Sequence, residues 1–230
     1  MGVSKMKQKM TLAQRVNILR ASVMGANDGI LSVAGIVVGV AGAPTNSYSI
    51  LISGLAGMLA GTISMAKGEY VSVNTQKDAQ KMAIQRQKKA LADNYDDEVA
   101  MVTKKYVDQG ISTPLAQQAT AEMMQEDALV TTVRERYGFN PSEFISPYAA
   151  GIASMISFPT GSILPLVSIT FFPAHIKVLA TVIAVAIALA ITGYTAAILG
   201  NADRKHSVFR NVFAGLLTML VTYFIGHLFA

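Results

Sequence analysis

Residues 21–43, ASVMGANDGILSVAGIVVGVAGA, form an apolar run whose only charge belongs to Asp28. A helix needs about 20 apolar residues to cross a hydrocarbon layer about 30 Å thick. Four further windows meet this requirement: about 48–66, two between 147 and 202, and about 207–229. The sequence therefore predicts an all-α integral membrane protein with five transmembrane helices.

The third and fourth windows share a stretch in which Lys177 is the only charge. The FPAH segment at 172–175 is the natural break between them, because proline interrupts helices. Pro159 and Pro165 also lie inside the third window, which makes it the least regular of the five. We still expect one membrane helix on each side of the break.

The composition agrees with a membrane protein. Hydrophobic residues make up 52% of the chain, charged residues 14%, and the mean hydropathy is +0.41. A soluble domain carries about 25% charged residues. The net charge of +5 comes from basic residues beside apolar windows, so it indicates topology rather than nucleic-acid binding. The chain has no cysteine, which excludes disulfides and thiolate metal sites.

The charged residues divide the chain into four segments. We expect a cytoplasmic N-terminal segment at 1–20, transmembrane helices 1 and 2 at 21–66, a polar domain at 67–146, and transmembrane helices 3–5 at 147–230. The polar domain lies between helices 2 and 3 of the membrane part. It holds ten basic and twelve acidic residues and has no strand pattern.

This polar domain is predicted to contain three helices. Residues 69–91 have no helix breaker, so the second membrane helix can continue into the domain. The bounds of the next two helices come from capping and breaking residues: Asp93 or Asn94 to Gly110, and Thr113-Pro114 to Gly138. The sequence thus predicts a three-helix cytoplasmic domain inserted into the membrane part.

The basic residues also predict the orientation. Of the 19 Lys and Arg residues, 18 fall in the N-terminal segment, the polar domain or the region around the start of the fifth window, which leaves only Lys177 for the other side. Because positive charge is retained in the cytoplasm, we expect the N-terminus and polar domain inside and the C-terminus outside. Asp28 within the first apolar run argues against a cleaved signal peptide. The short chain favours a bacterial plasma membrane over an organelle.

Asp28 is the first candidate for function. A carboxylate inside a membrane helix costs about 2.5–3.5 kcal/mol on insertion scales, so it needs a compensating use. Asp28 is therefore a candidate cation ligand or proton carrier, although it could instead be a helix-end aspartate at the membrane surface. Another backbone could approach closely at Asn27 and the flanking Gly25 and Gly29. Such spacing of small residues more often reflects ordinary helix packing than a functional site.

Met65 and Glu69 are four residues apart and share one face of a helix. A soft thioether beside a hard carboxylate suits a borderline ion such as Fe²⁺. The alternatives are a gap-filling methionine and a solvated glutamate. In the polar domain, Glu122 shares a face with Glu126, and Glu98 lies three residues before Met101; such acidic faces are usually solvated.

Enzymatic chemistry has no support in the sequence. The three histidines, His175, His206 and His227, have no zinc spacing. No catalytic triad, phosphate loop or dinucleotide fingerprint occurs. We therefore expect neither an enzyme nor a bound prosthetic group.

Several motifs together resemble the vacuolar iron transporter family. They are RASVMGANDGILS at 20–32, SMAKGEYVS at 64–72, SFPTGSILP at 157–165, and the stretches 210–223 and 226–229. The resemblance covers nearly the whole chain in the same order. It implies a five-span homodimer with an ion path along the dimer interface, between the first two helices. It also implies export of Fe²⁺, often with Mn²⁺, from the cytosol in exchange for protons.

The resemblance assigns the ion pathway to Asp28, Met65 and Glu69, with Asn27 beside them. In the polar domain it leaves Glu98 and its neighbour Met101 as metal candidates, and then Glu122, Glu126 and Glu135 on the last helix. This chain departs from the family pattern at Gln87 and Ala90, where the family has paired glutamates. The domain would then bind fewer ions, prefer another metal, or serve in dimer contacts and gating.

Three hypotheses follow. The first is a homodimeric antiporter that exchanges Fe²⁺ or Mn²⁺ for protons across a lipid bilayer. The second is a membrane-anchored metal-binding or regulatory scaffold that does not transport. The third is a transporter of another small solute, in which Asp28 carries only protons.

Overall fold

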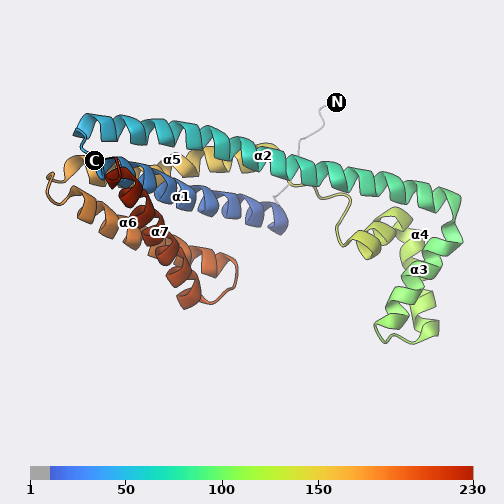
Figure 1. Cartoon of the computed structure of the whole chain (residues 1–230). Coiled ribbons are helices and arrows are strands. Elements are labelled where there is room, and N and C mark those ends of the chain that lie inside the picture. The colour runs from blue at the N-terminus through green and yellow to red at the C-terminus, as the bar shows by residue number, and fades with distance from the viewer. Residues whose placement is uncertain (1–10, 230) are drawn as a thin grey trace, which may run out of the picture. The chain divides into compact units, whose positions relative to one another are not determined.

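The computed structural model describes residues 11–229, and the regular secondary structure of this part of the chain is all helix, joined by loops (Figure 1). Its helices are α1 Leu12–Ala41, α2 Ser47–Asp93, α3 Tyr95–Asp108, α4 Thr113–Tyr137, α5 Pro147–Phe171, α6 Lys177–Leu199 and α7 Arg204–His227. Helices α1, α2, α5, α6 and α7 are long and apolar enough to cross a membrane. The predictions of an all-α fold and of five such helices are confirmed.

Helix α1 begins well before the apolar run that the sequence suggested as its membrane part. Thr11 caps it: its hydroxyl accepts a hydrogen bond from the Gln14 backbone at 3.3 Å, and the Gln14 side chain accepts from the Thr11 backbone at 3.1 Å. This capping box satisfies amide groups at the start of the helix. Hydropathy therefore indicates the membrane-compatible stretch of α1, whereas the capping residues indicate where the helix begins.

Helix α2 is a single helix of 47 residues, as the lack of breakers in 69–91 predicted. At 1.5 Å per residue it is about 70 Å long, which is about twice the thickness of a bilayer core. Its N-terminal half is apolar and its C-terminal half is polar, so it belongs to two compact units. One unit comprises the chain up to Ser72 and from Ser146 onward, and the other comprises Val73–Ile145.

In the first unit, α1 is central and contacts α5, α6 and α7. Buried residues from these four helices form the core: Val33, Val37, Phe158, Ile169, Val185, Leu189 and Met219. Many isoleucine, leucine and phenylalanine side chains on α6 and α7 instead point outward and are exposed. This arrangement is typical of helices that face lipid.

Helix α5 runs unbroken through Pro159 and Pro165. Close contact with α1 accompanies this regularity: a Cβ atom at Gly29 would overlap the carbonyl of Phe158, and one at Gly161 would overlap the carbonyl of Ala26. Prolines are tolerated in membrane helices where neighbouring helices and hydroxyl side chains meet the polar needs of the backbone. The glycines of the first window are thus explained by packing within the chain.

The second unit contains the end of α2 together with α3 and α4. The N-cap of α4 is Ser112, one residue before the predicted Thr113, and the helix ends at Gly138 (φ 73°) as predicted. A kink that the sequence analysis did not predict divides α4 at Asp127 (φ −158°, ψ 98°). The Asp127 carboxylate accepts the backbone N–H of Val130 at 2.9 Å, so it caps the second part of the helix.

Candidate functional site

Three of the four predicted pathway residues line a single open groove of about 480 Å³ in the first unit. Asp28 comes from α1, whereas Met65 and Glu69 come from α2. The other lining residues are Ser32 and Ile36 of α1, Gly57, Ala60, Gly61, Ser64 and Gly68 of α2, and Phe158 of α5. The groove therefore brings two carboxylates and one thioether together from two helices.

Small residues on α2 make room for this groove. Gly57, Gly61, Ser64 and Gly68 recur every three or four residues, which places them on one face of the helix. A Cβ atom at Gly61 would overlap the ring of Phe158, so a larger residue there would push α2 away from α5. The same face carries Met65 and Glu69, which the spacing of four residues predicted.

Asp28 is half-buried in the groove. Ser32, one turn along α1, donates a hydrogen bond to its Oδ1 at 2.9 Å. Among the described residues 11–229, no ion pair involves Asp28. An ionised carboxylate within a membrane-compatible helix is costly without a countercharge, so a cation or a proton in the groove would stabilise it.

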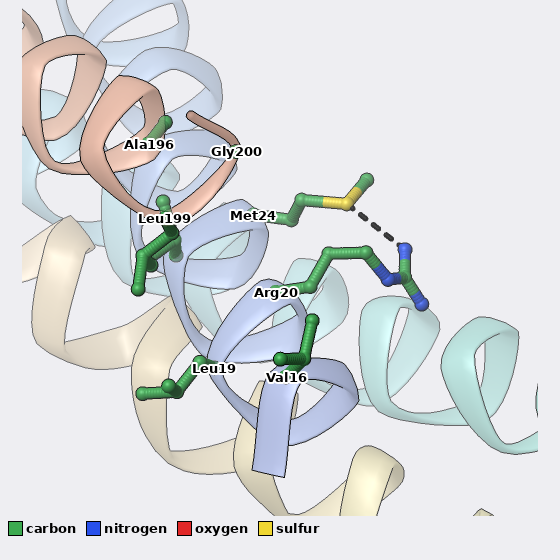
Figure 2. A pocket seen from close by; sticks show the side chains of 8 residues that line it. Val16, Leu19, Arg20, Met24, Ala196, Leu199 and Gly200 are labelled. Atoms are coloured by element: carbon green, nitrogen blue, oxygen red, sulfur yellow. Dashed lines mark hydrogen bonds between the residues drawn. The ribbon is translucent and has the colours of Figure 1, made fainter. Parts of the chain in front are cut away.

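Glu69 is more buried than Asp28, with 8% of its side chain exposed, and it has a countercharge. The Arg20 guanidinium donates to its Oε1 at 2.9 Å. Arg20 is itself 46% exposed and also donates to Asn17 Oδ1 at 3.3 Å. Its guanidinium contacts Met24 Sδ at 3.2 Å as well (Figure 2). Arg20 precedes Asp28 by eight residues, about 12 Å along α1. Sequence reasoning did not assign Arg20 to the site, although it opens the motif 20–32.

Asn27 is not among the residues that line the groove. Its Oδ1 accepts hydrogen bonds from Thr192 Oγ1 at 2.9 Å and from Asn211 Nδ2 at 2.7 Å. Asn211 also donates to the Leu189 carbonyl at 2.7 Å. These bonds tie α1 to α6 and α7. A polar asparagine inside the fifth apolar window was the signal for Asn211, which sequence reasoning missed.

In the second unit, Glu98 is almost fully buried and is held by a basic side chain. Arg136 donates to both of its oxygens, at 2.8 and 2.9 Å, and Gln87 Nε2 donates to Oε2 at 2.6 Å. Gln87 is fully buried, and its own Oε1 has no hydrogen-bond partner in the described structure. The nearby candidate Met101 is half-buried. A cation at Glu98 would have to compete with Arg136.

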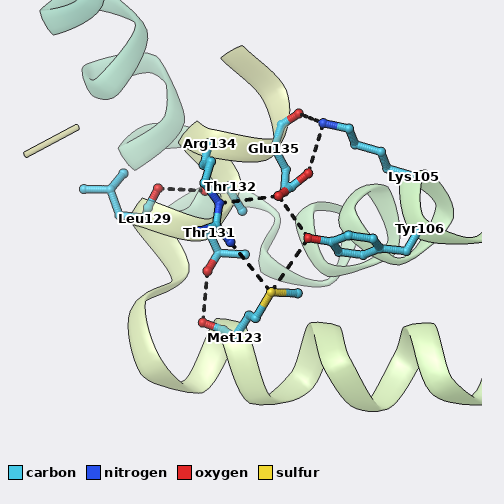
Figure 3. Close-up of polar contacts among 8 residues, drawn as sticks. All are labelled: Lys105, Tyr106, Met123, Leu129, Thr131, Thr132, Arg134 and Glu135. Carbon is cyan, nitrogen blue, oxygen red and sulfur yellow. Dashed lines mark hydrogen bonds and ion pairs between the residues drawn. The ribbon is translucent and has the colours of Figure 1, made fainter. Parts of the chain in front are cut away.

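Glu135 is held in a similar way, by Lys105 at 3.0 Å, Tyr106 at 2.9 Å and Arg134 at 3.6 Å (Figure 3). Burial alone would raise the Glu135 pKa, but the hydrogen bonds from Lys105 and Tyr106 outweigh it and lower the pKa. Burial and the hydrogen bond to Glu135 raise the pKa of Tyr106. Glu135 is therefore an ionised, already paired carboxylate at neutral pH.

The remaining candidates, Glu122 and Glu126, are exposed, and Glu122 accepts a hydrogen bond from Gln118 at 3.1 Å. Across residues 11–229, no three His, Asp or Glu side chains lie close enough together to hold a metal ion. Within one chain, the structure therefore does not bring the five candidates of the second unit together.

Comparison with known proteins extends the resemblance over the whole groove. The sequence model of the VIT family matches residues 19–227. A vacuolar iron transporter of Acanthamoeba castellanii is 33% identical over 96% of this chain and 82% of its own length. Vacuolar iron transporter homolog 2 of Arabidopsis thaliana is 30% identical over 97% of this chain and 90% of its own.

Vacuolar iron transporter homolog 1 of Oryza sativa subsp. japonica is 35% identical over 94% of this chain and 75% of its own length. The family match spans α1 to α7 and includes every residue that lines the groove. On this evidence, and as its motifs predicted, the chain belongs to the VIT family, the family of the vacuolar iron transporters.

Proposed function

We propose that this protein transports divalent metal ions, Fe²⁺ and also Mn²⁺, out of the cytosol through the groove between α1 and α2. The observation that carries the proposal is the convergence of Asp28, Met65 and Glu69 on one groove of a membrane-compatible helix bundle. The relative from Acanthamoeba castellanii is named a vacuolar iron transporter, which supports iron as the first ion. Metal ions here are substrates and not a resident cofactor.

Each of the three side chains has a distinct role in the proposal. Glu69 receives the ion at one end of the groove, and Met65 adds a soft ligand that favours Fe²⁺ over harder ions. Asp28 binds the ion deeper in the bundle. When the ion leaves, a proton takes its place on Asp28, because an uncompensated carboxylate at that depth is costly. This exchange would couple metal export to proton movement.

We further propose that the protein works as a homodimer. The groove is open, and among the described residues one chain lines it with two carboxylates and one thioether. An octahedral ion such as Mn²⁺ needs about six ligands, so a second copy facing the groove would complete the coordination. The proposed path would then run between the first two helices of each copy.

The proposed topology follows the basic residues. With 18 of the 19 on one side, the N-terminus and the unit Val73–Ile145 would be cytoplasmic and the C-terminus outside. In this arrangement the Arg20 and Glu69 end of the groove faces the cytosol. We propose a bacterial plasma membrane as the location, which makes the protein an exporter.

Flux in proteoliposomes tests the proposal. Purified protein is assayed with Fe²⁺, Mn²⁺ and Zn²⁺, with and without a pH gradient, next to Asp28→Asn and the exposed control Asp78→Asn. Gradient-driven flux that is lost only in Asp28→Asn supports the antiporter. Absence of flux for every ion, from a folded dimer, would instead favour the scaffold hypothesis. Flux of another solute without metal would favour the third hypothesis.

A further inference from the structure

We propose that Arg20 is a tethered counter-cation that occupies Glu69 when no metal is bound and must leave before a divalent ion can bind there. This inference rests on the proposed function, since it concerns how the substrate gains access to the same groove. It assigns a role to a residue outside the predicted ligand set.

The geometry of Glu69 places the two cations in direct competition. Arg20 Nη2 lies 2.9 Å from Glu69 Oε1, and Glu69 lines the groove that also contains Met65 and Asp28. A metal ion bound to the same carboxylate would place two like charges within a few ångström of each other. Because like charges at that distance repel strongly, Arg20 at Glu69 opposes the binding of a metal ion to the same carboxylate.

The two partners of this ion pair differ in exposure, and this decides which one moves. The Glu69 side chain is 8% exposed, so its ionised carboxylate needs a countercharge. The Arg20 side chain is 46% exposed, so water can hydrate its guanidinium. Arg20 also makes a 3.3 Å hydrogen bond to Asn17 and a 3.2 Å contact with Met24 Sδ, both on its own helix. Figure 2 shows the contact with Met24. When Arg20 releases Glu69, the ion pair with Glu69 is therefore the one bond to another helix that is lost among these hydrogen bonds of Arg20.

The aliphatic part of Arg20 has space beside it. Arg20 is one of the residues that line an apolar pocket of about 250 Å³, with Val16, Leu19 and Leu199. Figure 2 shows its side chain extending past Met24, away from Leu19 and Leu199. The guanidinium can swing outward while the methylene groups stay on this apolar surface, as arginine side chains commonly do.

A purely structural role for the pair predicts the opposite result on mutation. If the ion pair only held α1 and α2 together, removing Arg20 would loosen the groove and weaken metal binding. If Arg20 competes with the ion, removing it frees Glu69, and metal binding becomes tighter. If Arg20 occupies Glu69 in most molecules at rest, the apparent affinity for metal is reduced to the fraction of molecules in which Glu69 is free.

The test measures Mn²⁺ binding by calorimetry on the full-length protein in detergent, together with flux. We expect Arg20→Gln to lower the apparent Kd, and the KM for flux, by about tenfold. Arg15→Gln is the matched control, because Arg15 is an exposed arginine of the same helix, whereas the ion pair with Glu69 belongs to Arg20; this variant should match the wild type. If Arg20→Gln does not fold, Arg20→Met, which preserves the apolar contacts of the side chain, replaces it.

A double-variant cycle gives the decisive comparison. In a Glu69→Gln background, Arg20→Gln should leave the remaining affinity unchanged, because the carboxylate for which the two cations compete is gone. Wild-type or weaker binding by a folded Arg20 variant would overturn the inference, even if flux shows that transport is real. Tighter binding by Arg20→Gln without flux in any variant would support the inference and contradict transport.

Discussion

Replacing Arg136 with methionine should destabilise the second unit, because it leaves the carboxylate of Glu98 buried without its countercharge. Only 7% of the Glu98 side chain is exposed, and Arg136 supplies two of its three hydrogen bonds. Breaking a buried ion pair costs about 3–5 kcal/mol. Arg136 is 37% exposed, so water can partly reach the site and the low end, about 3 kcal/mol, applies.

Hydrogen exchange of the full-length protein measures this effect locally. Each 1.4 kcal/mol changes an equilibrium about tenfold, so amides of α3 and α4 should lose protection by about 100-fold. Arg86→Met, which removes an exposed arginine from α2, is the control and should change exchange little. The double variant Glu98→Gln/Arg136→Met should recover much of the protection, because it removes both charges. A loss below tenfold in Arg136→Met would refute the reasoning.

Three further predictions concern other parts of the molecule. The pKa of Glu135 is lower in the folded protein than in the unfolded chain, so Glu135 stabilises the second unit above its unfolded pKa, and this contribution is lost as the pH falls through the folded pKa. The acid unfolding of Glu135→Gln should therefore depend less on pH than that of the wild type. An unchanged pH dependence would contradict this. Asn211→Leu leaves Asn27 with one hydrogen-bond donor fewer and should cost about 1 kcal/mol in a detergent unfolding assay, whereas full stability would show that the network contributes little. Met65→Leu should lower Fe²⁺ flux more than Mn²⁺ flux, since it removes the soft ligand; equal losses would refute a selectivity role.

Much of the fold was predictable because it depends on local and nearly additive properties. Apolar runs long enough to span a bilayer predicted the five membrane-compatible helices, and the absence of breakers predicted the continuity of α2. Gly138 predicted the end of α4, since its positive φ suits glycine. The kink at Asp127 escaped prediction, because an aspartate inside a helical pattern gives no sign of whether its side chain will cap the next turn.

The candidate site was only partly predictable. The spacing of Met65 and Glu69 placed both on one helix face, and hydropathy made Asp28 conspicuous. Neither could show that these residues share a groove, which depends on how closely α1, α2 and α5 approach at their glycines. The relevant distances join residues far apart in the sequence.

By itself, the sequence predicted the five membrane-compatible helices and the family, and it made Asp28, Met65 and Glu69 candidates, because periodicity, hydropathy and motifs are properties of neighbouring residues. Only the tertiary structure separated Asp28, which lines the groove, from the adjacent Asn27, which bonds to α6 and α7. Only it paired Glu69 with Arg20 and Glu98 with Arg136. A carboxylate's chemistry depends on the charges within a few ångström, and folding decides which charges those are.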